Sequence, residues 1–324
     1  MPIRVNANLL RSALWICGLV AAALTAQCGP LHRADVAAEP TLVLHLDVDG
    51  LRPTAIGQYL MSEMDKPEAQ GMVATFQTML NLDPRKQLHG VTLYSTGKAP
   101  EDGVVLAYAD FEEERLVTLA KGAKDYQSTS YKQHTIHSWI NEQKIGSNGV
   151  NPRVYAAFPG GQLVILAQQE ARVTQALDVL DHKAPSLVGS KLYPQLGASG
   201  SPGFMQAAAR KLDIPDYAPN AALLRMAKVA RLEIGEAQGQ LKITLNLEAG
   251  DEEVSKQMLS VGQGLVALMK LQQDTPASVK LAEGLSLRQD GTGVAATLTV
   301  STAQAIELMK SSAARQVLKK ANGG

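Results

Sequence analysis

The sequence predicts an α+β protein of two similar lobes, each a mostly antiparallel sheet with helices on one face. Two observations predict this fold class. The same succession of strand, turn and helix patterns occurs twice along the chain, and neighbouring strands are separated by short glycine-containing turns instead of helices. Such hairpin connections favour antiparallel pairing, because parallel strands need a longer crossover. We expect the order β-β-α-β-β-α in each lobe, and the 324 residues are enough for two domains.

The chain begins with the pattern of an export signal. Arg4 and Arg11 precede an uncharged apolar run at residues 12–26. This run is shorter than the roughly 20 residues of a transmembrane helix and has the length of the apolar core of a secretory signal peptide. The sequence therefore predicts an exported protein, periplasmic or secreted, with no transmembrane domain after signal cleavage.

The predicted cleavage site has two candidates. Ala26 ends the apolar run, but the bulky Leu24 lies two residues before it, where cleavage sites carry a small residue. Val36-Ala37-Ala38 fits the small-residue rule better, although it lies farther from the run. We assign residues 1–38 to the signal peptide and leader.

Cys28 is the position where an exported lipoprotein would carry its lipid. Gln27 before it does not fit the small-residue box of such proteins, so we expect no lipid anchor. Removal of residues 1–38 takes away both cysteines, which suits an oxidising compartment and excludes a cysteine nucleophile. The whole chain has 31 basic and 31 acidic residues, so it has no basic footprint for nucleic acid.

The internal repeat is the most informative pattern. Residues 91–122 and 229–262 each contain an alternating run, a polar turn, a second apolar run and an acidic cluster that opens a helix. Residues 161–180 and 293–309 each lead from an apolar strand into a segment with helical periodicity. Turn dipeptides separate the strands at Asp102-Gly103, Gly160-Gly161 and Asp290-Gly291.

Residues 241–247 give the clearest strand pattern, with Leu and Ile alternating with Lys, Thr and Asn. The helix that follows has acidic residues at 251–253. Acidic residues near a helix N-terminus stabilise its dipole, so we interpret this cluster and the one at 110–114 as helix-capping charge instead of catalytic carboxylates. The apolar stripe of the predicted helix consists of Val254, Met258, Val261, Leu265 and Leu268.

The segments ahead of the two repeats differ. A strand at 41–48 and helices near 55–64 and 71–80 precede the first repeat, whereas residues 190–219, rich in Gly, Pro and Ala, precede the second. The predicted domains are a first lobe at residues 41–185, a second lobe at residues 186–319 and a disordered tail at residues 320–324.

Residues 42–50 combine a hydrophobic strand with the ending Asp-x-Asp-Gly. This ending resembles the first motif of haloacid-dehalogenase-like phosphatases, which depend on Mg²⁺. The resemblance implies that Asp47 accepts the phosphoryl group and that Asp49 is the general acid and base. Both carboxylates would then lie at the carboxyl end of one strand, where they reach the same phosphate.

The same resemblance assigns the phosphate-binding hydroxyl to Ser95 or Thr96 and the later metal ligands to Gly250-Asp251-Glu252. The sequence departs from the family in three respects. Leu51 stands where the family has threonine. No lysine lies in a stretch that resembles the family's third motif, and the helix–strand alternation of a parallel sheet is absent. The alternative is that the two aspartates only end a strand and start a turn.

Residues 47–57, DVDGLRPTAIG, carry a second resemblance. They look like a stretch of uncharacterised exported bacterial proteins, in which a hydrophobic strand and Asp precede Leu-Arg-x-Ser/Thr-x-Ile/Leu-Gly and duplicated sheet-and-helix units follow. The resemblance implies no activity. We expect Arg52 to form a structural pair with Asp47 or Asp49, which would neutralise the candidate nucleophile.

No other catalytic or cofactor motif is present. His134 and His137 are close in sequence, but residues 127–139 read as strand, where these side chains point to opposite faces and share no metal. The chain also lacks a nucleophile elbow, a phosphate loop and a dinucleotide fingerprint, so we expect no cofactor.

The leading functional prediction is an exported, non-enzymatic binding or envelope-associated scaffold protein. Its ligand is unknown and can be a protein, a peptide or a lipid, and no catalytic residue is assigned. An exposed methionine or leucine face would favour a peptide or lipid ligand. The alternative is the Mg²⁺-dependent phosphatase that uses Asp47 and Asp49.

Overall fold

The computed structural model describes residues 31–142, 151–160, 162–197, 203–210, 224–271 and 283–311. The expected signal run at 12–26 and the expected tail at 320–324 lie outside these ranges. The chain divides into two compact units, the first ending at Ala198 and the second beginning at Ser199, with residues 54–56 grouped with the second. Residues 186–198 thus belong to the first unit, whereas the sequence suggested the second lobe.

The first unit begins with a short 3₁₀ helix and contains seven strands among its described elements. In chain order these elements are η2 (Arg33–Asp35), β1 (Leu42–Asp47), α2 (Val48–Leu51), α3 (Ala55–Met64), α4 (Pro67–Leu80), α5 (Pro84–Gln87), β2 (Leu88–Ser95), η3 (Pro100–Asp102), β3 (Gly103–Ala109), α6 (Glu113–Lys121), β4 (Gln127–Tyr131), β5 (His134–Ile140), β6 (Arg153–Ala157), β7 (Leu163–Ala167), α7 (Glu170–Leu180) and η4 (Leu187–Gly189).

The second unit is simpler over its described residues. Its elements are β8 (Gly203–Arg210), β9 (Val229–Ala237), β10 (Gln240–Glu248), α9 (Glu252–Leu271), β11 (Leu285–Asp290), β12 (Gly293–Ser301) and α11 (Thr302–Lys310).

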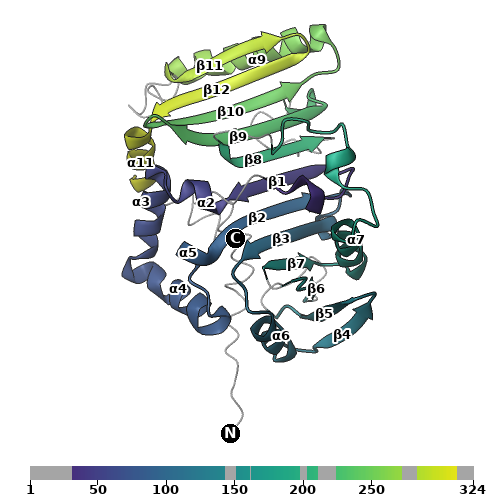
Figure 1. Cartoon of the computed structure of the whole chain (residues 1–324). Coiled ribbons are helices and arrows are strands. Elements are labelled where there is room, and N and C mark those ends of the chain that lie inside the picture. The colour runs from purple at the N-terminus through teal and green to yellow at the C-terminus, as the bar shows by residue number, and fades with distance from the viewer. Residues whose placement is uncertain are drawn as a thin grey trace. The chain divides into compact units, whose positions relative to one another are not determined.

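The two units have the same strand order (Figure 1). In the first it is β1-β2-β3-β7-β6, and β5 and β4 extend the sheet beyond β6. In the second it is β8-β9-β10-β12-β11. All of these pairs are antiparallel, and α6 and α7 follow the same strands in the first unit as α9 and α11 do in the second. The protein is therefore an α+β protein with two similarly connected sheet-and-helix lobes.

Several predicted elements have the bounds that the sequence indicated. The helix near 55–64 is α3, and the helix-period segment after β7 is α7, residues 170–180. Residues 127–139, which we read as one strand, form the hairpin β4–β5 instead, because Lys132 adopts φ 53° and turns the chain between them. Strand β8 was not predicted, because its Ala-rich residues carry little strand preference.

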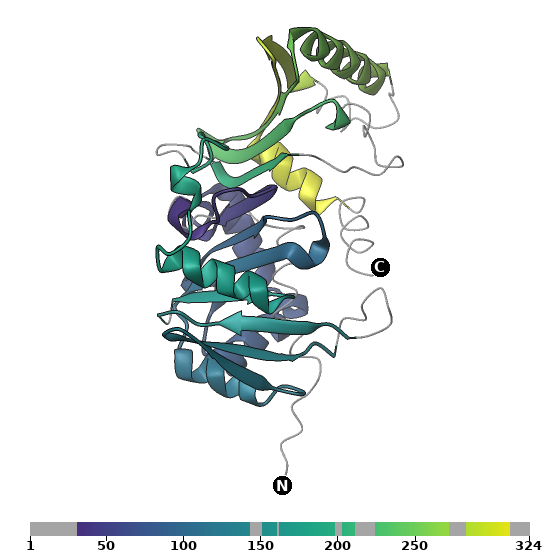
Figure 2. The ribbon, with the colours of Figure 1, turned by 90° about the vertical axis from the view of Figure 1, so that its right-hand side faces the viewer.

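Helices cover the first unit more fully than we expected, since adjacent residues on opposite faces of β3 are both buried. Leu106 is 0% exposed and Ala107 is 4% exposed. Helix α6 packs against the face of Ala107 through Leu116 and Ala120. Helix α7, which Figure 2 shows in front of the strands of this unit, contacts β3, β5, β6 and β7.

In the second unit, α9 lies along β11 and β12 (Figures 1 and 2). Its buried face is formed by Ser255, Met258 and Gly262, so only Met258 of the predicted stripe is buried. The helix is rotated by about 70° from the predicted orientation. A Cβ at Gly262 would lie 3.2 Å from the Leu287 side chain, which shows how closely the glycine lets the helix approach β11.

Candidate functional site

The Asp-x-Asp-Gly motif lies where β1 ends and α2 begins. Asp47 is the last residue of β1 and pairs with Gly90 of the antiparallel strand β2. Asp49 lies in α2, and its Oδ1 accepts a hydrogen bond of 2.6 Å from Nη1 of Arg52. The described salt bridge of Arg52 is therefore with Asp49, the second of the two carboxylates that we named for it.

Arg52 also fastens α2 to the start of β2. Its Nε donates to the carbonyl oxygen of Arg85, and its Nη2 donates to that of Leu88, both at 2.8 Å. Three donors of one guanidinium thus hold a carboxylate and two main-chain carbonyls, which is the fixed fork geometry that arginine provides.

His89 lies between two carboxylates. Its Nδ1 is 3.0 Å from Oδ2 of Asp49, and its Nε2 is 3.1 Å from Oδ1 of Asp110. The pairing of β2 with β3 shifts in register between Leu88 and Gly90, at His89 itself. Such a bulge redirects a side chain. We call Asp49, Arg52, His89 and Asp110 the acid–histidine cluster.

The acid–histidine cluster stabilises the protonated imidazole. Partial burial lowers the pKa of His89, but the hydrogen bond and charge of Asp110 and the charge of Asp49 outweigh it and raise the pKa above its ordinary value. A neutral imidazole has one N–H and can donate to only one of the two carboxylates, whereas the imidazolium donates to both. With His89 protonated, the four side chains carry no net charge.

This geometry limits what the acid–histidine cluster can do chemically. Both ring nitrogens of His89 are engaged, so neither offers a lone pair to a metal or to a substrate proton. Among the described residues, no group of three or more His, Cys, Asp or Glu side chains is placed to hold a metal ion. The cluster is therefore suited to linking α2, β2 and the residue after β3 in a proton-dependent way.

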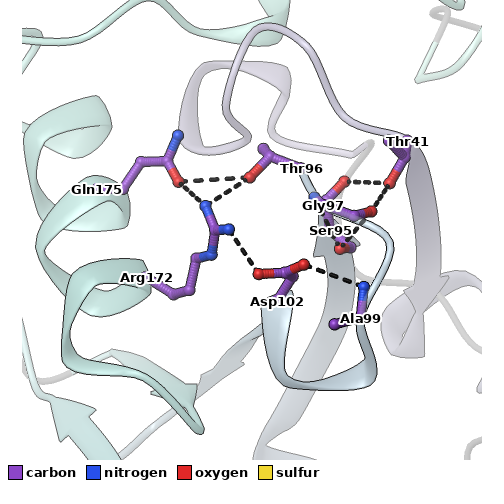
Figure 3. A network of polar contacts seen from close by, with 8 residues as sticks. All are labelled: Thr41, Ser95, Thr96, Gly97, Ala99, Asp102, Arg172 and Gln175. Atoms are coloured by element: carbon purple, nitrogen blue, oxygen red, sulfur yellow. Dashed lines mark hydrogen bonds and ion pairs between the residues drawn. The ribbon is translucent and has the colours of Figure 1, made fainter.

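Ser95 and Thr96, the candidate phosphate-binding residues, lie in a second polar network (Figure 3). Arg172 of α7 donates to Oγ1 of Thr96 at 3.0 Å and to Oδ1 of Asp102 at 2.6 Å. Ser95 exchanges hydrogen bonds with the main chain of Gly97. We call Thr96, Asp102, Arg172 and Gln175 the turn–helix network, because it fastens the β2–β3 turn to α7.

Asp102 is the anionic member of the turn–helix network. Its Oδ2 accepts the main-chain N–H of Ala99 at 3.1 Å while Oδ1 accepts from Arg172. The hydrogen bond from Arg172 is the main reason that the pKa of Asp102 lies below its ordinary value. The hydroxyls that the phosphatase resemblance assigned to phosphate are thus bonded to protein groups, that of Ser95 to Gly97 in the turn and that of Thr96 to Arg172 and Gln175 of α7.

The remaining candidate residues are apart from these clusters. Asp251 belongs to the second unit, where its Oδ1 accepts the N–H of Val254 at 2.8 Å and caps α9. His134 and His137 lie on β5 with different partners, Asp181 for His134 and the Tyr126 hydroxyl for His137. Burial lowers the pKa of His137.

The sequence predicted neither a role for His89 nor the ion pair of Arg172 with Asp102. A signal existed for the first of these. Extending the hairpin register outward from the Ser95–Gly103 pair places His89 opposite Ala109, and therefore next to Asp110. No local pattern indicates Arg172, because it lies 70 residues from Asp102.

Comparisons with known proteins give a fold and no family. No family model and no curated protein matches the chain. The crystal form III structure of TP0453 is similar over 86% of this chain and 97% of its own, with 9% sequence identity and a TM-score of 0.50. Crystal form IV gives a TM-score of 0.47 at 10% identity over 88% and 98% of the two chains. The likeness to form III supports the α+β fold of two lobes.

No described helix has the length and apolar character that crossing a membrane requires.

Proposed function

We propose that this chain is an exported, non-enzymatic binding or envelope-associated protein. The proposal rests on the apolar surface of α9 in the second unit. Val261, Leu268 and Leu271 are 45%, 58% and 75% exposed, although they lie on one side of a long helix. Large apolar side chains gathered on one exposed side of a helix are typical of a surface that binds a partner.

The charges around this apolar surface are modest. Glu252 and Lys256 form an exposed ion pair in the first turns of α9, and Lys270 lies near its C-terminal end. The exposed apolar surface of Val261, Leu268 and Leu271 lies between these charged ends. An apolar ligand such as a peptide side chain or a lipid chain therefore fits it better than a polyanion does.

We also propose that the two lobes arose by internal duplication, which their repeated strand order supports. An exported, duplicated sheet-and-helix protein matches the uncharacterised group that residues 47–57 resemble. Gly57 of this motif has a physical role, because a Cβ there would lie 1.8 Å from the carbonyl oxygen of Leu51. The Arg52 salt bridge and Gly57 explain two of the motif positions by folding alone.

The phosphatase alternative has less support. Its chemistry places both aspartates at the carboxyl end of a parallel strand, whereas β1 pairs antiparallel with β2. Asp49 is held by Arg52 and His89, and Asp251 caps a helix in the other unit.

Thermal-shift measurements of the exported chain test the proposal. The probes are apolar peptides, phosphatidylglycerol vesicles, inorganic phosphate and Mg²⁺, because only a ligand of the native state raises the Tm. We expect a peptide or the vesicles to raise it, and the triple variant Val261→Ser, Leu268→Ser, Leu271→Ser to abolish that rise. The matched control changes exposed polar residues of the same helix, Lys256→Ser, Gln257→Ser and Gln263→Ser.

Hydrolysis of p-nitrophenyl phosphate with Mg²⁺ tests the alternative in the same preparation. We expect no turnover beyond that of the Asp47→Asn variant. Mg²⁺-dependent turnover that Asp47→Asn removes would overturn the non-enzymatic proposal.

A further inference from the structure

Residues 31–38 are part of the folded first unit. We call them the N-terminal strap. Leu31, Val36 and Ala37 are 5%, 0% and 3% exposed, which is the burial of core residues. The strap lies against residues 185–197, the segment that follows α7, and Ala37 forms a β-bridge with Ser186.

Arg33 makes the strongest contacts of the strap. Its Nη1 donates to the carbonyl oxygens of Tyr193 at 2.7 Å and Leu196 at 2.8 Å. Its Nη2 donates to the carbonyl oxygens of Leu187 at 2.9 Å and Leu192 at 3.5 Å. One guanidinium therefore holds four carbonyls of a segment with little regular structure, and a charged donor is about twice as strong as a neutral one.

Main-chain bonds complete the attachment. The N–H of Leu187 donates to the carbonyl of Val36 at 2.7 Å, and that of Ala38 donates to the carbonyl of Pro185 at 3.1 Å. The Tyr108 hydroxyl of β3 also donates to Asp35 at 2.9 Å. Removing the strap would leave the buried Leu187 uncovered and several carbonyls without these donors.

These contacts bear on signal cleavage, and the inference rests on the proposed export. We infer that the export signal is cleaved after one of the residues 26–30, so that the N-terminal strap stays in the mature protein. The inferred leader is therefore shorter than the leader at residues 1–38 that the sequence predicts. Val36-Ala37-Ala38 has small side chains because they fit a packed bridge to Ser186, not because a protease reads them.

The sequence of residues 26–30 supports cleavage there. Ala26 is small and ends the apolar run, and Ala26-Gln27-Cys28 also places small residues at the two positions that a signal peptidase reads. In either frame one peptide bond is hydrolysed, with water supplying the hydroxyl of the new carboxyl group and a proton of the new amino group. Ala26 is a recognition position in both frames.

The test is the N-terminus of the chain after expression with its own signal in a Gram-negative host. Intact mass and N-terminal sequencing of the exported fraction should give a first residue from Gln27 to Leu31. A first residue at Glu39, or anywhere else within or after the strap, would overturn the inference while leaving export intact. A chain that keeps residues 1–26 and stays in the cytoplasm would instead contradict the proposed function and, with it, the inference.

Two pairs of variants sharpen this test. Ala26→Leu should block processing, whereas Ala38→Leu should leave the N-terminus unchanged; the reverse pattern would place the cut after Ala38. In the exported protein, Arg33→Ala should lower the Tm by about 5–10 °C. The exposed control Lys98→Ala should change it by no more than about 1 °C. An equal Tm for both variants would mean that the strap is not part of the mature fold.

Discussion

Gly197 lies directly against Leu31 in the first unit. Gly197 has φ 73°, and a Cβ atom at this position would be 3.1 Å from the Cβ of Leu31 and 3.2 Å from its carbonyl oxygen. The glycine thus serves two purposes, a left-handed backbone and a close approach to the N-terminal strap.

The two purposes of Gly197 can be separated by substitution. Gly160 has the similar φ of 74° but nothing within 4 Å of its Cβ position. We expect Gly160→Ala to lower the free energy of unfolding by about 1 kcal/mol through backbone strain. Gly197→Ala should cost about 1–2 kcal/mol more because of the strap. Denaturant unfolding measures both, and equal losses would mean that the strap does not press on residue 197.

The acid–histidine cluster predicts a pH-dependent stability. The folded-state pKa of His89 is raised, so its contribution is full below its unfolded value of about 6.5 and is lost as the pH rises through the folded value. The Tm difference between wild type and His89→Asn should therefore be about 1–2 °C larger at pH 5.5 than at pH 8.5. The exposed His182→Asn should show no such change, and a pH-independent difference for His89→Asn would contradict the role of the cluster.

Asp102 predicts the opposite pH dependence. Its folded-state pKa is lowered, so the stability it contributes is present above its unfolded value of about 3.9 and is lost as the pH falls through the folded value. Asp102→Asn should cost about 1–3 kcal/mol at pH 6 and much less at pH 2.5, as urea unfolding would show. Glu101→Gln, at the exposed neighbour, should cost less than about 0.5 kcal/mol at both values.

The orientation of α9 is tested by its own apolar residues. Met258 is 0% exposed in the core of the second unit, whereas Leu268 is 58% exposed. Met258→Ala should cost about 2–4 kcal/mol of unfolding free energy, and Leu268→Ala should cost less than about 0.5 kcal/mol. Comparable losses would mean that the helix packs through the stripe that the sequence predicted.

Two glycines of the first unit should respond to alanine with opposite signs. A Cβ at Gly57 would overlap the carbonyl oxygen of Leu51, while Gly71 in α4 has nothing within 4 Å. Gly57→Ala should cost about 3 kcal/mol or more, because two main-chain segments must separate. Gly71→Ala should stabilise the protein by about 0.5–1 kcal/mol through helix propensity. Thermal unfolding of the two variants gives both signs.

The sequence predicted those parts of the fold whose signal is local. Residues 241–247 alternate in polarity and form β10, and the helical period of residues 170–180 follows from the contact of α7 with its sheet. The predicted orientation of α9 was wrong. The prediction followed the apolar residues, whereas Gly262 lies on the buried face, and a glycine contributes almost nothing to a hydropathy pattern.

The contacts of the candidate sites are not local, which is why most of them were missed. Arg33 binds carbonyls 154–163 residues away, and the chain near it contains no pattern that names them. The strand register brings His89 next to Asp110. The bulge that directs the imidazole toward both carboxylates is not indicated by any sequence pattern. The ion pair of Arg52 with Asp49 could be predicted from the sequence, because the two residues are only three positions apart.

The N-terminal strap also determines when the first unit can finish folding. Arg33 and Tyr193 are 160 residues apart, so the strap leaves the ribosome long before the segment that receives it. A chain that emerges from its N-terminus must keep Leu31 and Val36 uncovered until residue 197 has appeared. This delay agrees with the export that we propose, because a chain that crosses a membrane unfolded must not complete its fold before most of its length has passed.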